Sequence, residues 1–338
     1  DEILLEKGFA YSTPLAIYFD VDKKEDYTKL SGQDLSKNIS HAGHGEISDP
    51  DKKHPYDFAL WFFKAGAHAQ ALQTWMSPFA SPLVDNGEGF PGWHIECSAM
   101  SHRYLGATFD IHMGGIEHIP VHHTNEIAQS ESAFGVPMSN LWMHNEHLLV
   151  NGGKMSKSEG TSYLLSDILD KGYSALDLRY FFLQAHYRSK QNFTWDALSA
   201  SKNALQTIYS KLIELRSQTQ DEPGTIIESF SQSFKEAISD DINVPQALGI
   251  FHQVLKYGDT PANILATIYD MDQVLGLNLQ TYEASIIDVP KKVHELLKER
   301  KNAREQKNWQ RSDELREQIS NLGFIVSDTN GEQKIEKK

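Results

Sequence analysis

Hydrophobic and polar positions divide the chain into two parts with different periodicities. In the first part, "AIYFDV" (16–21) and "TFDIHM" (108–113) are short apolar runs typical of strands. The segment "NEIAQSESAFG" (125–135) instead has helical spacing and ends at a glycine. Because strand and helix patterns alternate, this part predicts an α/β sheet domain.

From about residue 197 onward, long helical patterns replace the alternation. Helical spacing covers residues 197–218, 233–241, 244–258 and 262–277, and Pro245 stands where a first helical turn tolerates proline. This part predicts an all-α bundle. A link at about 282–290 precedes two further helices, 291–306 and 310–321. The tail "NGEQKIEKK" (330–338) is expected to be disordered.

The segment "NGGKMSKSEG" (151–160) interrupts the pattern near the middle of the chain. It follows the apolar run 148–150 and precedes a helically spaced run that begins at Tyr163. A glycine-rich loop between a strand and a helix is therefore expected. The lysines Lys154 and Lys157 of such a loop are either solvent-exposed charges or ligands for an anion, and the pattern alone favours the first.

Length and composition are those of a globular protein. With 338 residues, two or three domains are expected, and 40% hydrophobic residues suffice to build their cores. No apolar stretch approaches the roughly 20 residues that a membrane helix requires, and the first residues lack the features of a signal peptide. The single cysteine, Cys97, excludes an internal disulfide framework. We therefore expect a cytoplasmic protein with no membrane contact.

The formal net charge of −14 argues against indiscriminate nucleic-acid binding, which needs concentrated lysine and arginine. Residues 291–317 are the one sustained basic stretch, with nine Lys or Arg against six Asp or Glu. Two interpretations remain open for this stretch. It is either a solvated helix face with intermixed charges or a face that binds nucleic acid.

Candidate metal ligands gather between residues 92 and 131. His122 and Glu126 are four residues apart, so they share one face if a helix starts near Val121. Pro120 supports that start and leaves His118 outside the helix.

The thiolate of Cys97, an imidazole and a carboxylate all suit zinc. Two alternatives remain, because a single cysteine is often only a small buried hydrophobe and the pair His122 and His123 can simply mark a polar helix start. A zinc hydrolase is disfavoured, since H-E-x-x-H is absent.

A set of motifs in a fixed order gives these residues a context. The segments are "KLSGQ", "YDFALW", "PGWHIECSAM", "FDIH.GG", "HH.NEIAQSE.AFG", "WMHN", "KMSKS" and "HYRS". In this order they resemble the cysteinyl-tRNA synthetases, a family of class I aminoacyl-tRNA synthetases. The resemblance continues through "SDDINVPQAL" and the C-terminal helices, so it covers nearly the whole chain.

The resemblance implies a fold and a division into parts. Residues 1–150 are expected to form the remainder of a Rossmann-like catalytic domain with a connecting insertion, incomplete at its N-terminus. Residues 151–200 would hold the KMSKS loop and a region that contacts the tRNA stem. Residues 201–285 would form a helical tRNA-binding bundle, and residues 290–338 a small anticodon-binding region.

The resemblance also implies site residues. Cys97, His122 and Glu126 match three of the family's four zinc ligands, and the zinc is implied to bind the thiol of the substrate cysteine. Serine is then rejected, because its hydroxyl is a poor zinc ligand. Trp93 and His112 match positions in the amino-acid pocket. For both, packing is the better interpretation if the family is set aside.

The KMSKS loop is implied to act on ATP, which reacts as its magnesium complex. Lys157 is the expected catalytic and ATP-binding residue against the phosphates, with Lys154 in support. Glycines 152, 153 and 160 would let the loop close. The reaction would activate L-cysteine as cysteinyl-adenylate and transfer the cysteinyl group to tRNA(Cys). We expect a monomer.

The chain departs from the family pattern in several places. The family's H-x-G-H motif is expected before the first residue, and "HAGH" (41–44) is rejected as a match because no apolar strand precedes it. Roughly a hundred N-terminal residues, about a small domain, are therefore expected to be absent together with the fourth zinc ligand, a cysteine. The isolated 338-residue chain would then be inactive. Glu117 and Thr124 also replace residues common in the family, although they preserve the ligand spacing.

Two rival functions remain at this stage. A related ligase joins cysteine to an amino-sugar with the same zinc and adenylate chemistry, but the C-terminal helices argue against it. A non-catalytic remnant that binds tRNA or a partner is the other rival.

Overall fold

A computed structural model describes residues 1–35, 49–219, 223–283, 290–329 and 332–337. The chain divides into two compact units, Asp1–Asn203 with Ser233–Ile250 and Ala204–Gln232 with Phe251–Lys338. No helix within these described ranges has the length and apolarity needed to cross a membrane. The predicted division into four functional parts stays a prediction.

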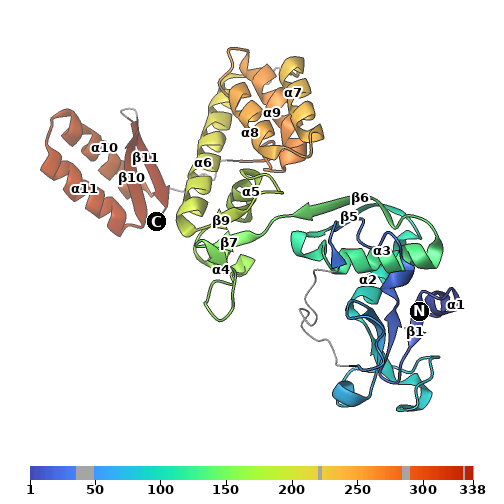
Figure 1. Cartoon of the computed structure of the whole chain (residues 1–338). Helices are drawn as coiled ribbons and strands as arrows, with labels where there is room; N and C mark the ends of the chain where they lie inside the picture. The colour runs from blue at the N-terminus through green and yellow to red at the C-terminus, as the bar shows by residue number, and fades with distance from the viewer. Residues whose placement is uncertain (36–48, 220–222, 284–289, 330–331, 338) are drawn as a thin grey trace. The chain divides into compact units, whose positions relative to one another are not determined.

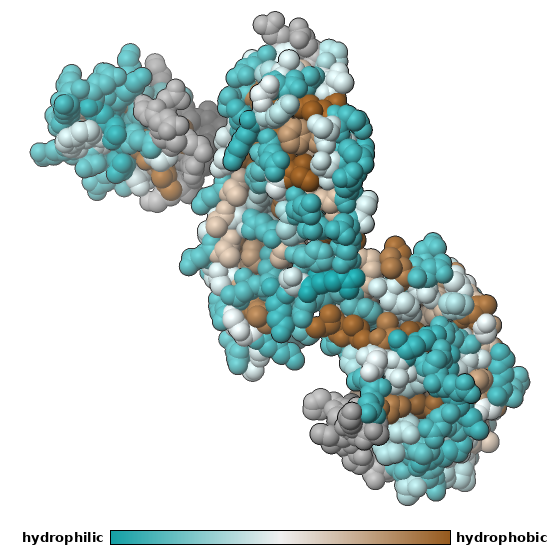
Figure 2. All heavy atoms as spheres, turned by 45° about the horizontal axis from the view of Figure 1, so that its top comes forward, coloured by the Kyte–Doolittle hydropathy of each residue, from teal (hydrophilic) through white to brown (hydrophobic). Residues whose placement is uncertain are grey.

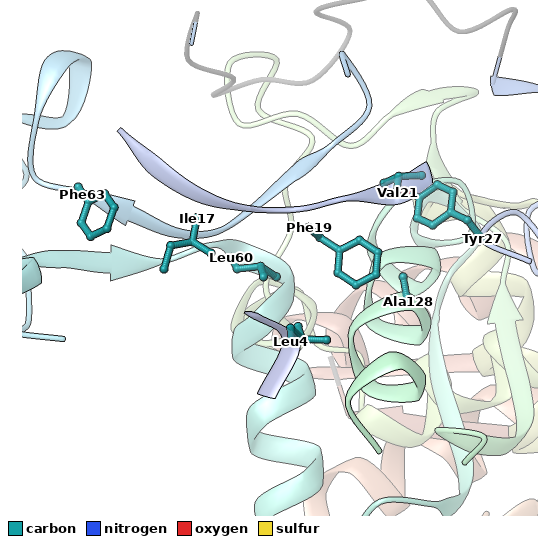
Figure 3. Close-up of a cluster of buried hydrophobic side chains, with 8 residues drawn as sticks. All are labelled: Leu4, Ile17, Phe19, Val21, Tyr27, Leu60, Phe63 and Ala128. Carbon is teal, nitrogen blue, oxygen red and sulfur yellow. The ribbon is translucent and has the colours of Figure 1, made fainter. Parts of the chain in front are cut away.

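The first unit begins with a short helix, α1 (Glu2–Glu6), and a four-stranded antiparallel sheet. The strands are β1 (Ala10–Ser12), β2 (Ala16–Phe19), β3 (Phe58–Phe63) and β4 (Gly89–Pro91), in that order. The 3-10 turn η1 (Val21–Lys23) follows β2. The sheet's buried side chains form a core with Ala128, which comes from a later helix (Figure 3). Sheet and helix therefore share one hydrophobic cluster.

Helix α2 (Trp93–Leu105) leads into a β-α-β unit. This unit comprises β5 (Phe109–Gly115), α3 (His122–Phe134) and β6 (Ser139–Asn145), with β5 and β6 parallel. The 3-10 turn η5 (Ile116–His118) stands between β5 and α3. Gly135 ends α3 in the left-handed conformation at φ 73°. The predicted strand at 108–113, the predicted helix at 125–135 and the α/β class are confirmed.

One face of the β5–β6 pair is exposed and apolar. Ile111 and Leu141 are cross-strand partners with 51% and 50% of their surface exposed, and Met113 beside them is 66% exposed. Parallel strands are usually covered on both faces, because the crossover packs on one side and other elements on the second. Figure 2 shows hydrophobic side chains at the surface of the chain in several places.

A small three-stranded sheet carries the KMSKS segment. Strand β7 (Leu148–Val150) pairs with β8 (Gly153–Lys154) and, in parallel, with β9 (Gln191–Phe193). Asn151 and Gly152 join β7 to β8 with φ of 52° and 80°. Both values are positive, as a type I′ hairpin turn requires, and Asn-Gly is the sequence that favours it. The prediction of a loop throughout 151–160 is therefore wrong at Gly153–Lys154.

Helices α4 (Leu165–Asp170) and α5 (Ala175–Leu183) pack on this small sheet. The chain then continues as α6 (Trp195–Gln218), α7 (Glu228–Ser239), α8 (Val244–Val254) and α9 (Pro261–Leu275) (Figure 1). All four helices match predicted segments, although α7 starts five residues before the predicted 233. The all-helical prediction for this part of the chain is confirmed.

The last described segment is a helix pair on a hairpin. Helices α10 (Lys291–Glu305) and α11 (Trp309–Asn321) share a core with β10 (Phe324–Thr329), which pairs with β11 (Glu332–Lys337). Disorder was the wrong prediction for residues 332–337. Ile335 pairs with Val326 and packs against the core, and this contact stabilises a strand in a tail whose composition is mostly polar.

Some predictions fall outside the described residues. The "HAGH" segment (41–44) lies there, and so do residues 284–289 of the predicted link.

Candidate metal and nucleotide sites

Helix α3 places two candidate metal ligands one turn apart. It begins at His122, directly after Pro120 and Val121, as the sequence predicts, and His118 lies outside it in η5. The Nε2 atom of His122 lies 2.8 Å from Oε1 of Glu126. Both side chains are almost fully buried.

The third candidate, Cys97, comes from the neighbouring helix α2. Its Sγ lies within 4.8 Å of the ligand atoms of His122 and Glu126. Two contacts hold α2 in place, one with strand β3 and one with helix α3. Gly92 precedes the helix so near to β3 that a Cβ there would lie 2.0 Å from the carbonyl oxygen of Ala59. Ser98 donates a hydrogen bond of 2.7 Å to Gln129 on α3. The structure thus brings all three predicted ligands together.

The surroundings of Glu126 fit a cation. Burial alone would raise the pKa of its carboxyl group, but the imidazoles of His112 and His122 outweigh burial and lower that pKa to about 2. The carboxylate is therefore ionised. Neither of its oxygens makes a well-directed hydrogen bond to the described part of the chain, despite being buried. A buried carboxylate beside a thiol and an imidazole is a donor set that suits zinc.

Four further histidines lie around these candidate ligands, and the sequence patterns did not predict that they cluster there. His94 Nδ1 lies 2.8 Å from His122 Nδ1, and His123 Nδ1 lies 2.8 Å from His144 Nε2. The ring of His118 is 5.1 Å from that of His122. Their concentration between residues 94 and 144, in a chain with 15 histidines, was the one available signal.

Burial keeps part of this cluster uncharged. Desolvation, with His122 nearby, lowers the pKa of His94 to about 4, and desolvation with His112 nearby lowers that of His123 to about 3. A neutral imidazole has a lone pair that can bind a metal or accept a proton. Burial also raises the pKa of the Cys97 thiol, and Glu126 adds to this effect. In the absence of a cation, the cysteine is therefore held as a thiol.

Both predicted pocket residues lie beside the ligands. The ring of Trp93 is 4.4 Å from that of His122 and is more than half exposed. His112, from β5, places its Nε2 3.3 Å from Oε2 of Glu126. Gly114 makes room for the neighbouring His123 ring, since a Cβ there would lie 2.6 Å from it. Trp93 thus offers an exposed apolar surface beside the ligands, and His112 contacts one of them directly.

Of the KMSKS lysines, Lys154 ends strand β8 and Lys157 lies in the loop that follows it. Ser156 and Thr161 close this loop with backbone and side-chain hydrogen bonds, and Gly152 N donates to Asn192 Oδ1 at 2.7 Å. The side chains of Lys154 and Lys157 are exposed, and neither ammonium group makes an ion pair or hydrogen bond to any described residue. Their ammonium groups are available to an anionic ligand.

The basic stretch at 291–317 is partly neutralised within its own fold. Arg300 is completely buried and donates to both oxygens of Asp328 and to Gln333, while Arg304 Nη1 lies 3.1 Å from Asp328. Arg311 pairs with Glu299 and Glu314. Lysines 298 and 301 are exposed, with no ion pair to the described residues. Any contact with nucleic acid therefore depends on fewer charges than the sequence count suggests.

Two family profiles match the chain. The class I (C) tRNA synthetase catalytic domain matches residues 2–203, and the cysteinyl-tRNA ligase anticodon-binding domain matches residues 288–335.

Curated relatives match along almost the whole chain. A protein of Burkholderia lata named cysteine–tRNA ligase 1 is 39% identical over 97% of this chain and 67% of its own length. Cysteine–tRNA ligases of Treponema denticola and Caldicellulosiruptor saccharolyticus are 36% and 37% identical, over 96% and 99% of this chain and 70% and 72% of their own lengths.

A solved LeuRS from Agrobacterium radiobacter K84, in a ternary complex with tRNA and LeuAMS, aligns with a TM-score of 0.46 and 14% identity. The alignment covers 62% of this chain and 33% of the LeuRS.

Proposed function

The chain belongs to the cysteine–tRNA ligase family of class I synthetases, and we propose on that premise that it activates L-cysteine with ATP and transfers it to tRNA(Cys). The observation that carries this proposal is the group formed by Cys97, His122 and Glu126, three zinc-type donors within 4.8 Å of one another. An enzyme specific for a thiol substrate has a direct use for zinc, and we expect it to work in the cytoplasm as a monomer.

These three side chains would hold a zinc ion. When bound, zinc would supply a position for the substrate thiolate, which bonds to it far better than a hydroxyl does. Glu126 supports this role, because its carboxylate is ionised and buried without well-directed hydrogen bonds to the described residues. The Nε2 atom of His112 lies 3.3 Å from Oε2 of Glu126, and this contact would fix the orientation of the carboxylate.

Trp93 and His112 would shape the amino-acid pocket. Trp93 has 59% of its surface exposed beside the ligands, so its ring can cover a small bound substrate. His112 lies between Glu126 and the ring of Trp142, 4.7 Å away, which leaves it little freedom to move. A fixed imidazole and an apolar indole would favour a compact substrate such as cysteine.

The KMSKS lysines would stabilise the leaving pyrophosphate. Adenylate formation breaks the bond between the α- and β-phosphates of ATP, and the negative charge that develops needs nearby cations. Lys157 and Lys154 are exposed and make no ion pair with the described residues, so neither would have to break one to bind phosphate. The positive φ of Gly152 and Gly160 gives the loop glycine-type hinges.

Transfer to tRNA would use the C-terminal part of the chain. The match to an anticodon-binding domain over residues 288–335 supports this role and disfavours a cysteine:amino-sugar ligase, which would have no anticodon to bind. A tRNA-binding protein without catalysis is the remaining rival. Cysteine-dependent ATP–pyrophosphate exchange, measured on the chain extended by the family's H-x-G-H segment, separates the two, since a binding protein would retain tRNA and show no exchange.

The zinc-selection step can be tested through binding alone. Titration of the zinc-loaded chain with L-cysteine and L-serine should give heat of binding for cysteine only. Cys97→Ser should lose zinc, measured as metal content after dialysis, because a serine hydroxyl does not replace a thiolate. His102→Asn is the matched control, since His102 lies on the same helix but stacks on Phe134, outside the ligand group. Full zinc retention by Cys97→Ser would refute the site.

A further inference from the structure

We propose that residues 21–32, which contain the first four residues of the KLSGQ motif, form a brace that positions the ligand-bearing helix α3, with Tyr27 and Lys29 as its positioning residues. The proposal rests on the zinc site proposed above and assigns a role to a motif that the site itself does not use. Both residues contact α3, although about a hundred residues separate them from it in sequence.

Tyr27 contacts the first half of the helix. Its hydroxyl donates a hydrogen bond to Oδ1 of Asn125, the residue next to Glu126. The ring itself is buried and belongs to the same hydrophobic cluster as Ala128, one turn further along (Figure 3). A buried hydroxyl that aims at one acceptor resists sliding and rotation of the helix more than apolar packing alone does.

Lys29 and Lys24 contact the second half of the helix. Both ammonium groups pair with Oε2 of Glu131, and the Lys24 contact is 3.2 Å. Asp26 holds the same two lysines at 2.7 and 3.1 Å. Glu131 is only 13% exposed, so this pairing is better protected from solvent than an ordinary surface ion pair.

Two of the three braced positions lie on a different side of α3 from the ligand positions, and the third lies at the edge of the ligand face. Residues 125, 128 and 131 are three apart, whereas His122 and Glu126 are four apart. At about 100° per residue, Ala128 and Glu131 lie about 120° to 180° from the two ligand positions, whereas Asn125 lies about 60° from His122. The brace can therefore fix the rotation of the helix without occupying the space in front of the ligands.

The start of α3 depends on such outside contacts. Its N-cap residue, Val121, has no side chain that can cap the helix. Thr124 donates to the Ile119 carbonyl at 2.7 Å and secures the first turn locally, and Lys7 donates to the Ala133 carbonyl at 2.6 Å at the far end. Between these ends, the brace determines how His122 and Glu126 face Cys97 on α2. A small rotation would separate the three donors, and metal affinity falls when ligands lose their support.

Cobalt binding tests the brace without any catalytic assay. Co²⁺ substitutes for zinc and gives absorption bands that report thiolate ligation and coordination geometry. Tyr27→Phe removes only the hydroxyl and should weaken Co²⁺ binding about 10-fold, the lower end of what an outer-shell loss costs. Lys29→Met should act in the same direction, and Lys29→Arg, which keeps the charge, should restore wild-type affinity.

Tyr173→Phe is the matched control. The Tyr173 hydroxyl shares a hydrogen bond of 2.6 Å with Ser199 Oγ within the same unit, and both residues lie outside residues 21–32 and α3. Both phenylalanine variants are expected to unfold at somewhat lower urea concentration, but only Tyr27→Phe should change Co²⁺ affinity and the visible spectrum. Unchanged affinity in Tyr27→Phe, or an equal loss in Tyr173→Phe, would overturn the brace. A wild-type chain without a cobalt–thiolate band would instead refute the zinc site, and with it any role of the brace toward a metal.

Discussion

The local environment of Glu126 determines the burial and the ionisation state of its carboxylate. Most glutamates on helices face water, whereas this one is buried with His112 on one side and His122 on the other. The two imidazoles keep the Glu126 carboxylate ionised, so a negative charge lies beside the Cys97 thiol. The buried anion, the thiol and the imidazole thus lie together, a grouping that their spacing in sequence suggests only in part.

The role of Lys157 can be measured by a single substitution. In the chain extended by the family's H-x-G-H segment, Lys157→Ala should lower the rate of cysteine-dependent ATP–pyrophosphate exchange about 100-fold, a typical cost of losing one group that stabilises transition-state charge. The KM for cysteine should change little, because the lysine acts on phosphates. Lys154→Ala should have a smaller effect in the same direction.

Lys190→Ala provides the control for these two lysines, since it removes an exposed positive charge outside the loop. If Lys190→Ala slowed exchange as much as Lys157→Ala, a general electrostatic effect would explain the data and the assignment of Lys157 would be wrong.

Sequence reasoning at this scale succeeded where spacing carries information. His122 and Glu126 were identifiable because they are four apart on a helix whose start Pro120 marks. His94 and His144 were not, because each approaches the cluster from a different element and across more than 20 residues of chain. Only folding brings such pairs together, so periodicity gives no sign of them.

At the scale of elements, hydrogen bonds to Asp241 connect the turn before α8 with the loop after α5. Arg188 Nε donates to it at 2.6 Å and the Tyr187 hydroxyl at 2.6 Å. The Arg188 guanidinium, with Tyr187, lowers the pKa of Asp241 to about 2. The folded-state pKa is thus below the unfolded value of about 4. The stabilising contribution is therefore present above pH 4 and is lost as pH falls toward 2.

We expect Asp241→Asn to reduce the pH dependence of stability between pH 4 and pH 2. The wild-type and variant curves of urea midpoint against pH should converge at the acid end. Asparagine tolerates the positive φ of 53° at this position, so the backbone conformation is retained. Because Asp241 is exposed, added salt should shrink the difference. Parallel curves across this range would contradict the pairing.

The buried Arg300 leads us to expect a larger effect on the free energy of unfolding at the C-terminal helix pair. Its guanidinium is completely buried, and Asp328 binds two of its nitrogens at 2.9 and 2.7 Å. Asp328→Ala would leave the arginine charge without its counter-ion and should lower the free energy of unfolding by about 3 to 5 kcal/mol. Hydrogen exchange at the backbone amides of α10 and α11, followed across a range of denaturant concentrations, would measure this.

The double variant Arg300→Met with Asp328→Ala is the control, because it removes both charges. It should recover part of the stability lost in Asp328→Ala alone. If the double variant were less stable than the single variant, charge burial would not be the cause.

Long periodic helices were predictable as elements, and short or mixed ones were not. Helices α6, α8 and α9 match their predicted segments because amphipathic spacing persists over several turns. The strand β11 was missed because its one core contact, through Ile335, stands in a charged tail that resembles disorder. The five-residue helix α1 was missed for a related reason, since so short a segment shows little periodicity.

For the whole molecule, an acidic protein that binds tRNA must concentrate its positive charge. The net charge is −14, and several basic groups between 291 and 317 are already paired with acids. Lysines 298 and 301 are exposed on α10 without such partners among the described residues. We therefore expect them to contribute more to tRNA affinity than Arg311 does.

Replacing both lysines by alanine should weaken tRNA(Cys) binding and reduce the slope of log affinity against log salt. Each lost phosphate contact should lower that slope by about 0.7 to 0.9. Filter binding across a range of salt concentrations would measure it. Arg311→Ala is the comparison, because Glu299 and Glu314 already engage its guanidinium. An equal change in both variants would remove the distinction between paired and unpaired charges.

The hairpin at Asn151 and Gly152 has a consequence for the chemical lifetime of the protein. An asparagine followed by glycine is prone to spontaneous deamidation, in which the glycine backbone nitrogen attacks the asparagine side-chain carbonyl and ammonia leaves. Here the Gly152 N–H is engaged by Asn192 Oδ1 at 2.7 Å, so the attack must wait until the hairpin opens. The turn that begins the KMSKS loop therefore also slows deamidation of Asn151. Loss of the Asn192 contact would allow isoaspartate to form at that position.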